Sequence, residues 1–176
     1  MAAWMWIIII FIICQRLAEL AIAKSNEKWM KERGGIETGS EHYKWFIIMH
    51  GLFFCGIILE TTLRSQKSLA PSIVILCLFI ATQLARVWCI QTLGRFWNTK
   101  IIVLPRVALI KKGPYKYVKH PNYFIVAAEL FLIPFLFGAF YSAFIFPILH
   151  VLLLKIRIPQ EEKALAAVAK EQTVKL

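Results

Sequence analysis

The chain alternates long apolar runs with short polar segments, and this pattern predicts membrane-spanning helices. Three runs are each long enough to cross a hydrocarbon core about 30 Å thick, at about 1.5 Å per helical residue: residues 3–22, 44–61 and 70–91. A fourth run, from Tyr123 to Leu154, is too long for one span and contains Pro134 and Gly138. We therefore expect a helical hairpin of two shorter spans, over residues 123–137 and 139–154. The pattern predicts an all-α integral membrane protein with about five transmembrane helices in a single domain, residues 1–176.

Composition supports a membrane protein. Hydrophobic residues make up 59% of the chain and the mean hydropathy is +0.64, whereas soluble domains are usually about half apolar. The first run has no basic segment before it and no small-residue cleavage site after it, so we expect it to remain in the mature protein. All four cysteines lie within predicted spans and form no CxxC pair. They are interpreted as apolar packing residues, and neither a metal site nor a disulfide is predicted.

The distribution of basic residues predicts the orientation of the chain. Sixteen of the 21 Lys and Arg residues lie in the segments 23–43, 92–120 and 155–176, whereas Arg64 and Lys67 lie in the loop on the opposite side. By the positive-inside rule the N-terminus is outside, and the C-terminus and the basic loops are cytoplasmic. The net charge of +11 is then a topology signal that also favours anionic membrane lipids as partners. No nucleic-acid recognition motif accompanies it, so no nucleic-acid partner is predicted.

Ionisable residues inside the predicted spans form a second candidate set, because an unpaired charge in lipid is costly. Arg16 and Glu19 are three residues apart on one helical face. They either pair with each other near the end of the helix or contribute to an internal, substrate-binding cavity. Glu129 is expected to face protein, with Arg86 as its partner. The two histidines within or at the ends of spans are interpreted as core or interfacial residues: His50 and His150.

Polar side chains gather on both sides of the predicted hairpin. Segment 113–123 precedes it with three tyrosines, a histidine and two prolines, and Arg157, Glu161 and Glu162 follow it. Pro159 suits the first turn of a separate cytoplasmic C-terminal helix. Because a hairpin returns the chain to the same membrane face, we expect these two clusters to meet there. Three further residues are expected at the same face, Glu41, His42 and Tyr43. The first two are candidates for substrate binding.

The combined pattern resembles the isoprenylcysteine carboxyl methyltransferase family of integral membrane methyltransferases. The family motif Gly-x-Tyr-x-x-x-(Arg/Lys)-His-Pro-x-Tyr is similar to segment 113–123, and Arg-x-x-x-Glu-Glu-x-x-Leu is similar to segment 157–165. The resemblance is close over the C-terminal half, and the first half resembles a short bacterial branch of the family. Lys119 stands where arginine is usual and keeps the charge without the bidentate fork. Phe124 stands where a small residue often follows, and a histidine often found upstream of Gly113 has no counterpart.

The resemblance implies an S-adenosylmethionine cofactor held by residues 92–176. It assigns cofactor binding to the motif residues Gly113, Tyr115, Lys119, His120, Pro121, Tyr123 and Glu162. Arg157 and Glu161 are the candidate catalytic residues, the first to orient an anionic acceptor. Which of the two glutamates contacts the cofactor stays open. The residues agree chemically with this cofactor, since a carboxylate, an ammonium, a sulfonium and an adenine require cationic, anionic and aromatic partners together.

Three functions are compatible with these residues. Short bacterial members of the family are associated with O-methylation of lipophilic polyketides, so we expect methylation of an alkylpyrone-like hydroxyl in the cytoplasmic membrane. The alternative is methylation of a prenylated cysteine carboxylate, as in eukaryotic members. A third hypothesis, of another class, is a non-enzymatic lipid-binding or transport component whose intramembrane charges line a pathway.

Overall fold

A computed structural model describes residues 3–64, 72–105, 107 and 109–173. Lys67 and the start of the expected 70–91 span lie outside these residues. Five helices account for most of the chain: α1 (Ala3–Lys31), α2 (Ser40–Leu63), α3 (Ile73–Leu93), α4 (Pro121–Leu136) and α5 (Phe140–Thr173). The connecting segments contain two short strands and two 3₁₀ turns: β1 (Ile36–Thr38), η1 (Gly94–Phe96), β2 (Ile101–Val103) and η2 (Gly113–Lys116).

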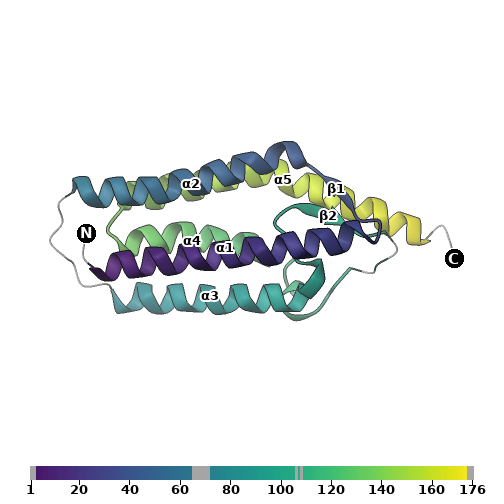
Figure 1. The fold of residues 1–176 in the computed structure, drawn as a ribbon, viewed down its shortest axis with the longest axis horizontal. Coiled ribbons are helices and arrows are strands. Elements are labelled where there is room, and N and C mark those ends of the chain that lie inside the picture. The colour runs from purple at the N-terminus through teal and green to yellow at the C-terminus, as the bar shows by residue number, and fades with distance from the viewer. Residues whose placement is uncertain (1–2, 65–71, 106, 108, 174–176) are drawn as a thin grey trace.

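The helices run side by side along one bundle, and the two ends of the chain lie at its opposite ends (Figure 1). Within the described residues, α1, α2, α3 and α5 are long and apolar enough to cross a membrane. Helix α4 is apolar but has 16 residues, which corresponds to about 24 Å. The all-α membrane architecture is therefore confirmed for four spans, and α4 is shorter than a typical span. Helices α4 and α5 pack against each other as the expected hairpin.

The separate C-terminal helix expected to begin at Pro159 is wrong. Helix α5 continues through Pro147 and Pro159 to Thr173 without a break. A proline in a helix removes one N–H bond, and for Pro159 the acceptor that loses it is the carbonyl of Lys155. Lys155 and Pro159 are both exposed, so the missing bond lies on the outer face of α5, and the helix continues past it. As a result Arg157, Glu161 and Glu162 are carried on the same rigid rod as the second half of the hairpin.

A two-stranded antiparallel sheet, absent from the all-α prediction, joins two polar connections. Strand β1 pairs with β2 in the register Ile36↔Val103, Glu37↔Ile102 and Thr38↔Ile101. Each strand has three residues, too few to produce a detectable alternation in the sequence. The sheet fastens the α1–α2 connection to the α3–α4 connection at the end of the bundle from which α5 projects (Figure 1).

The apolar core fills the opposite half of the bundle. It includes Ile9 and Ile12 of α1, Phe53 and Ile57 of α2, and Leu130 of α4, all nearly inaccessible. Many large apolar side chains on the outer faces of the helices are exposed, as expected for contact with lipid. The core therefore closes one end of the bundle, and polar side chains gather at the other end.

The turn between α4 and α5 is capped from α2. Gly138 has φ 68°, a conformation that glycine adopts without strain. The Glu60 carboxylate then accepts hydrogen bonds from the backbone N–H groups of Tyr141 and Ser142, both 2.9 Å long. These contacts satisfy unpaired amides at the start of α5 and place negative charge at the positive end of its dipole.

Candidate active site

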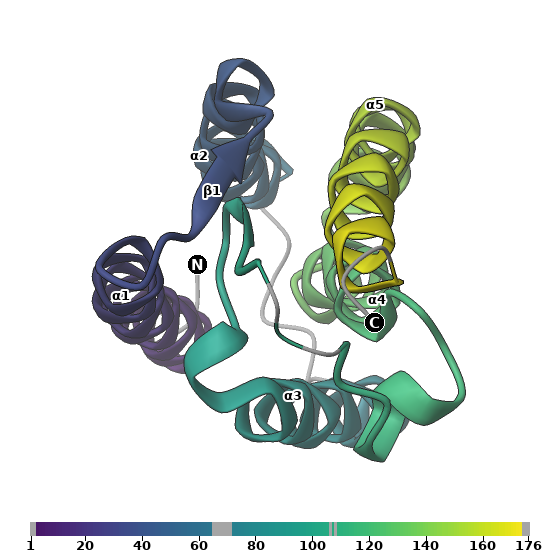
Figure 2. The ribbon, with the colours of Figure 1, turned by 90° about the vertical axis from the view of Figure 1, so that its right-hand side faces the viewer.

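The Gly113 motif is positioned by close packing of η2 against α3. Gly113 has φ +53°, and a Cβ atom there would lie 2.6 Å from Thr92 Oγ1 and 3.1 Å from Trp88 Nε1. Only glycine fits this turn without displacing α3 side chains. Seen from the end of the bundle that carries β1, η2 lies beside α3 and leads directly into α4 (Figure 2). The turn therefore delivers Tyr115 and His120 to the start of α4.

A chain of hydrogen bonds links α4, α5 and the segment before β2. Arg157 Nε donates to Tyr123 Oη at 2.7 Å, and Arg157 Nη2 donates to the backbone carbonyl of Thr99 at 2.6 Å. The Tyr123 hydroxyl in turn donates to a carboxylate oxygen of Glu161. Arg157 is buried and its guanidinium also lies 5.1 Å from the ring centre of Phe46. Arg157 and Tyr123 thus each have two hydrogen-bond partners, and Glu161 contacts both Tyr123 and His120. These contacts orient the three side chains for chemistry.

His120 lies between the two glutamates of α5. Its Nδ1 is 3.7 Å from Glu161 Oε2 and its Nε2 is 3.6 Å from Glu162 Oε1. The adjacent Glu161 carboxylate is the main cause of a raised His120 pKa, and partial burial opposes it. The imidazole also stacks on Tyr123, with ring centres 5.4 Å apart. Lys119 lies at the rim, with 84% of its side chain exposed and its Nζ 3.4 Å from Glu162.

A cluster of four charged side chains joins α1, α3 and α4 deeper in the bundle. Arg86 donates to Glu19 at 2.8 Å and to Glu129 at 2.9 Å. Arg16 donates to the same two carboxylates at 2.7 and 2.8 Å. The expected pairs Arg16–Glu19 and Arg86–Glu129 are both present, and Glu129 faces protein as predicted. Gln83 adds a third donor to Glu129 at 2.8 Å, so the buried charges balance and are hydrogen-bonded.

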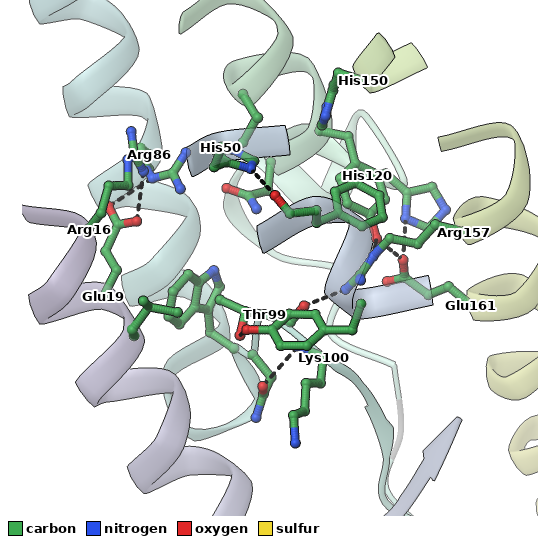
Figure 3. A pocket seen from close by; sticks show the side chains of 18 of the residues that line it. Arg16, Glu19, His50, Arg86, Thr99, Lys100, His120, His150, Arg157 and Glu161 are labelled. Atoms are coloured by element: carbon green, nitrogen blue, oxygen red, sulfur yellow. Dashed lines mark hydrogen bonds and ion pairs between the residues drawn. The ribbon is translucent and has the colours of Figure 1, made fainter. Parts of the chain in front are cut away.

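Two cavities meet at the motif residues. The first, about 300 Å³, extends into the bundle from Glu161 to Arg16 and Glu19, between apolar side chains that include Phe46, Phe54 and Val126. The second, about 520 Å³, lies at the polar end between β2, the segment after it and the end of α5. Four motif residues line both cavities: Tyr115, Lys119, His120 and Glu161. Figure 3 shows His120, Arg157 and Glu161 grouped on one side and Arg16, Glu19 and Arg86 on the other.

The structure brings most of the predicted site residues to these cavities, but not all. Tyr123 and Arg157 line the first cavity and Glu162 lines the second. Among the residues that the structure describes, four predicted site residues line neither cavity: Gly113, Pro121, Glu41 and His42. Gly113 shapes a turn, and Pro121 is buried as the first residue of α4. Glu41 is exposed, and His42 lies 3.4 Å from Gln160 of α5.

Several cavity residues carry no motif and escaped sequence analysis. Tyr43 is not among them: the sequence places it with Glu41 and His42, and it lines the first cavity and bonds to the Thr99 hydroxyl at 3.0 Å. Asn98 and Lys100 line both cavities. Their only signal was their position in polar connections. His50 and His150, interpreted from sequence as core or interfacial residues, line the first cavity. Both lie in apolar helices, where nothing in the sequence distinguishes a lining residue from a core residue.

The residues around the second cavity fit the donor and acceptor pattern of S-adenosylmethionine. Within the part of the chain that the structure describes, His120 Nε2 is buried and makes no hydrogen bond, and its neighbour is the Glu162 carboxylate at 3.6 Å, so its N–H can turn to a ligand oxygen. Glu161 and Glu162 provide anionic partners for an ammonium, and Lys119 provides a cation. The walls contributed by Ile102, Leu109 and Leu165 provide an apolar surface for a base.

Comparison with known proteins agrees with this site. The description "Isoprenylcysteine carboxyl methyltransferase (ICMT) family" matches residues 74–167, which include α3, both cavities' shared residues and most of α5. The chain belongs to this family. It is accordingly a multi-pass membrane protein of a methyltransferase family, as the motifs predicted.

Relatives of similar length extend the likeness beyond the family region. The chain is 44% identical over 160 residues to the uncharacterized protein YpbQ of Bacillus subtilis (strain 168), covering 91% of this chain and 95% of that protein. It is 29% identical over 156 residues to an uncharacterized protein of Haemophilus influenzae, covering 88% of this chain and 91% of that protein. No solved structure matches the chain. The first half, which the family description does not cover, is therefore shared with whole proteins of the same size.

Proposed function

We propose that the protein is an S-adenosylmethionine-dependent O-methyltransferase that acts on a lipophilic acceptor from the bilayer. The observation that carries this proposal is the meeting of two cavities at Tyr115, Lys119, His120 and Glu161. One cavity lies at the polar end of the bundle and the other lies among apolar side chains within it. A methyltransferase of this kind needs one site for a polar cofactor and one for a lipophilic acceptor, joined where the methyl group passes between them.

The second cavity is the proposed cofactor site. His120 and Lys119 would hold the cofactor carboxylate, and Glu161 or Glu162 would hold its ammonium. The cofactor supplies an electrophilic methyl carbon, whose bond to sulfur breaks as a bond to the acceptor oxygen forms. The two glutamates lie one residue apart on α5, and the one that also lines the first cavity is Glu161. Glu161 is therefore assigned to the junction and Glu162 to the cofactor side.

The chain's own contribution is positioning. Arg157 is held by Tyr123 and the Thr99 carbonyl and presents its charge to the first cavity, where it orients an anionic acceptor. An acidic enol or a carboxylate is already ionised at neutral pH, so no strong base is required. Exclusion of water and alignment at contact distance then lower the barrier by several kcal/mol.

The proposed acceptor is an alkylpyrone-like polyketide hydroxyl, and the alternative is a prenylated cysteine carboxylate. Aromatic and aliphatic side chains on the first cavity suit the lipophilic part of either molecule, which would enter sideways between helices. We further propose that all five helices cross the cytoplasmic membrane, with the N-terminus outside. The polar end of the bundle then faces the cytoplasm, where S-adenosylmethionine is available.

Binding of S-adenosylhomocysteine to the purified protein in detergent tests the cofactor assignment. The wild type is expected to bind, and His120→Ala and Glu162→Ala are expected to weaken binding at least tenfold, since each removes a charged contact worth about 1.5 kcal/mol or more. Lys116→Ala is the matched control, because Lys116 is an exposed cation in the same segment. Absence of binding in the wild type overturns the methyltransferase proposal.

The acceptor is tested separately with methyl-labelled cofactor. Membranes containing the protein are incubated with an alkylpyrone or with N-acetyl-S-farnesylcysteine, and labelled lipid products are separated. A labelled alkylpyrone ether supports the first acceptor class. A labelled methyl ester of the farnesylcysteine, with no pyrone product, replaces it with the second.

A further inference from the structure

The first cavity contains a buried histidine that the proposed reaction does not use. His150 of α5 lines this cavity and is 2% exposed. Within the described residues, neither of its ring nitrogens has a hydrogen-bond partner. The imidazole packs edge to face against Phe46, with ring centres 6.0 Å apart. A buried polar group left without a partner is costly and rare, so each such group requires a physical explanation.

Other unpartnered polar atoms belong to the same cavity. Trp97 Nε1 and Asn122 Oδ1 are buried without partners, and both residues line the first cavity. His50, across the cavity on α2, differs because its Nδ1 lies 2.8 Å from the backbone oxygen of Phe46. The cavity is therefore not a purely hydrocarbon channel. Its walls offer hydrogen-bonding atoms to whatever fills it.

His150 and Arg157 define the distance between two binding points. They are seven residues apart on α5, which places them on the same helical face and about 10 Å apart along the axis. The Arg157 guanidinium is held by Tyr123 and the Thr99 carbonyl, so it marks a fixed end of that distance. Figure 3 shows both side chains on the same side of the pocket, with His150 farther from Glu161. The two side chains therefore offer two separate binding points to one molecule in the cavity.

We propose that His150 binds a second oxygen of the acceptor head group, and so selects acceptors that carry two oxygen substituents at that spacing. One oxygen lies at the junction beside Arg157 and Glu161 and receives the methyl group. The other meets the His150 imidazole, which donates through one nitrogen and accepts through the other. An acceptor whose only oxygen is the methylated one leaves His150 without a partner, so this residue selects against it. The inference rests on the proposed methyltransferase function and specifies its substrate class.

Two probes that differ by one hydroxyl test the proposal directly. Olivetol is a pentyl-substituted resorcinol with two ring hydroxyls, and meta-pentylphenol has the same ring and tail with one. Dissociation constants are measured calorimetrically on the purified full chain in detergent, with and without S-adenosylhomocysteine. The wild type is expected to bind olivetol about tenfold more tightly than the phenol, the equivalent of one hydrogen bond.

Three variants assign that preference to His150. His150→Phe keeps a flat ring without nitrogens and is expected to bind both probes equally. His150→Gln retains a donor and an acceptor and is expected to restore part of the preference. Phe146→Leu is the matched control, because Phe146 is a buried core residue one turn earlier on α5, and it is expected to keep the wild-type preference.

The outcomes separate this inference from the proposed function. Equal binding of the two probes by the wild type, or an unchanged preference in His150→Phe, overturns the role of His150. Loss of S-adenosylhomocysteine binding by the wild type overturns the methyltransferase proposal instead, and the probe preference is still measured without that ligand. His150→Phe is expected to bind S-adenosylhomocysteine as the wild type does, because His150 does not line the second cavity as described.

Discussion

Replacing Tyr123 with Phe removes one oxygen atom that connects two predicted catalytic residues. The Tyr123 hydroxyl accepts from Arg157 Nε at 2.7 Å and donates to Glu161. Hydrogen bonds inside helical membrane bundles average about 0.6 kcal/mol, but bonds to charged groups contribute about 1.5–3 kcal/mol. Both partners here are charged, and each keeps a second contact: Arg157 with the Thr99 carbonyl and Glu161 with His120. We therefore expect a net loss of about 2 kcal/mol, below the sum of two such bonds.

Two measurements follow from that value. The free energy of unfolding, measured in mixed detergent micelles, is expected to fall by about 2 kcal/mol. Methyl transfer is expected to fall at least tenfold in kcat/KM, because Arg157 and Glu161 lose the group that aligns them. Tyr117→Phe is the matched control, since Tyr117 is 78% exposed and lies just before α4. A Tyr123→Phe protein whose stability and kcat/KM both match those of Tyr117→Phe would refute the assigned role of this hydroxyl.

Three further predictions follow from other contacts. Glu129→Gln leaves the buried arginines with one carboxylate and is expected to destabilise the protein by about 3–5 kcal/mol; adding Arg86→Gln restores neutrality and is expected to recover part of the loss in the same unfolding assay. Because the His120 pKa is raised above its ordinary value of 6.5, its ionic contribution is complete below that value and is lost as the pH rises through the raised pKa. The wild type is therefore expected to melt above His120→Gln in acid, with the difference shrinking in alkali, and a constant difference contradicts the ion pairs with Glu161 and Glu162. Gly113→Ala forces a Cβ to 2.6 Å from Thr92 at φ +53° and is expected to lower both the melting temperature and S-adenosylhomocysteine affinity, whereas Gly51→Ala, which meets nothing within 4 Å, is expected to preserve both.

The sequence predicted the membrane class and most of the polar site. Apolar runs are signalled locally, so three long spans and the α4–α5 hairpin were found from composition and length alone. Arg157 and Glu161 were found because their motif spacing is short. Prediction failed at Pro159, where proline was expected to begin a new helix but lies on the exposed face of one that continues to Thr173. The three-residue strands also escaped, because so short a segment has no measurable period.

The sequence by itself determined which residues are available and which of them flank the apolar runs, since hydropathy and motif spacing are properties of neighbouring residues. Only the tertiary structure decided which of them share a cavity. Helices that are apolar on every side do not reveal which face turns inward, so packing alone assigned His150 to a cavity and Ile57 to the core. Packing also joined Arg157 to the Thr99 carbonyl, a backbone contact between segments far apart in the chain. Such contacts depend on how five helices pack against one another, and no local pattern encodes that.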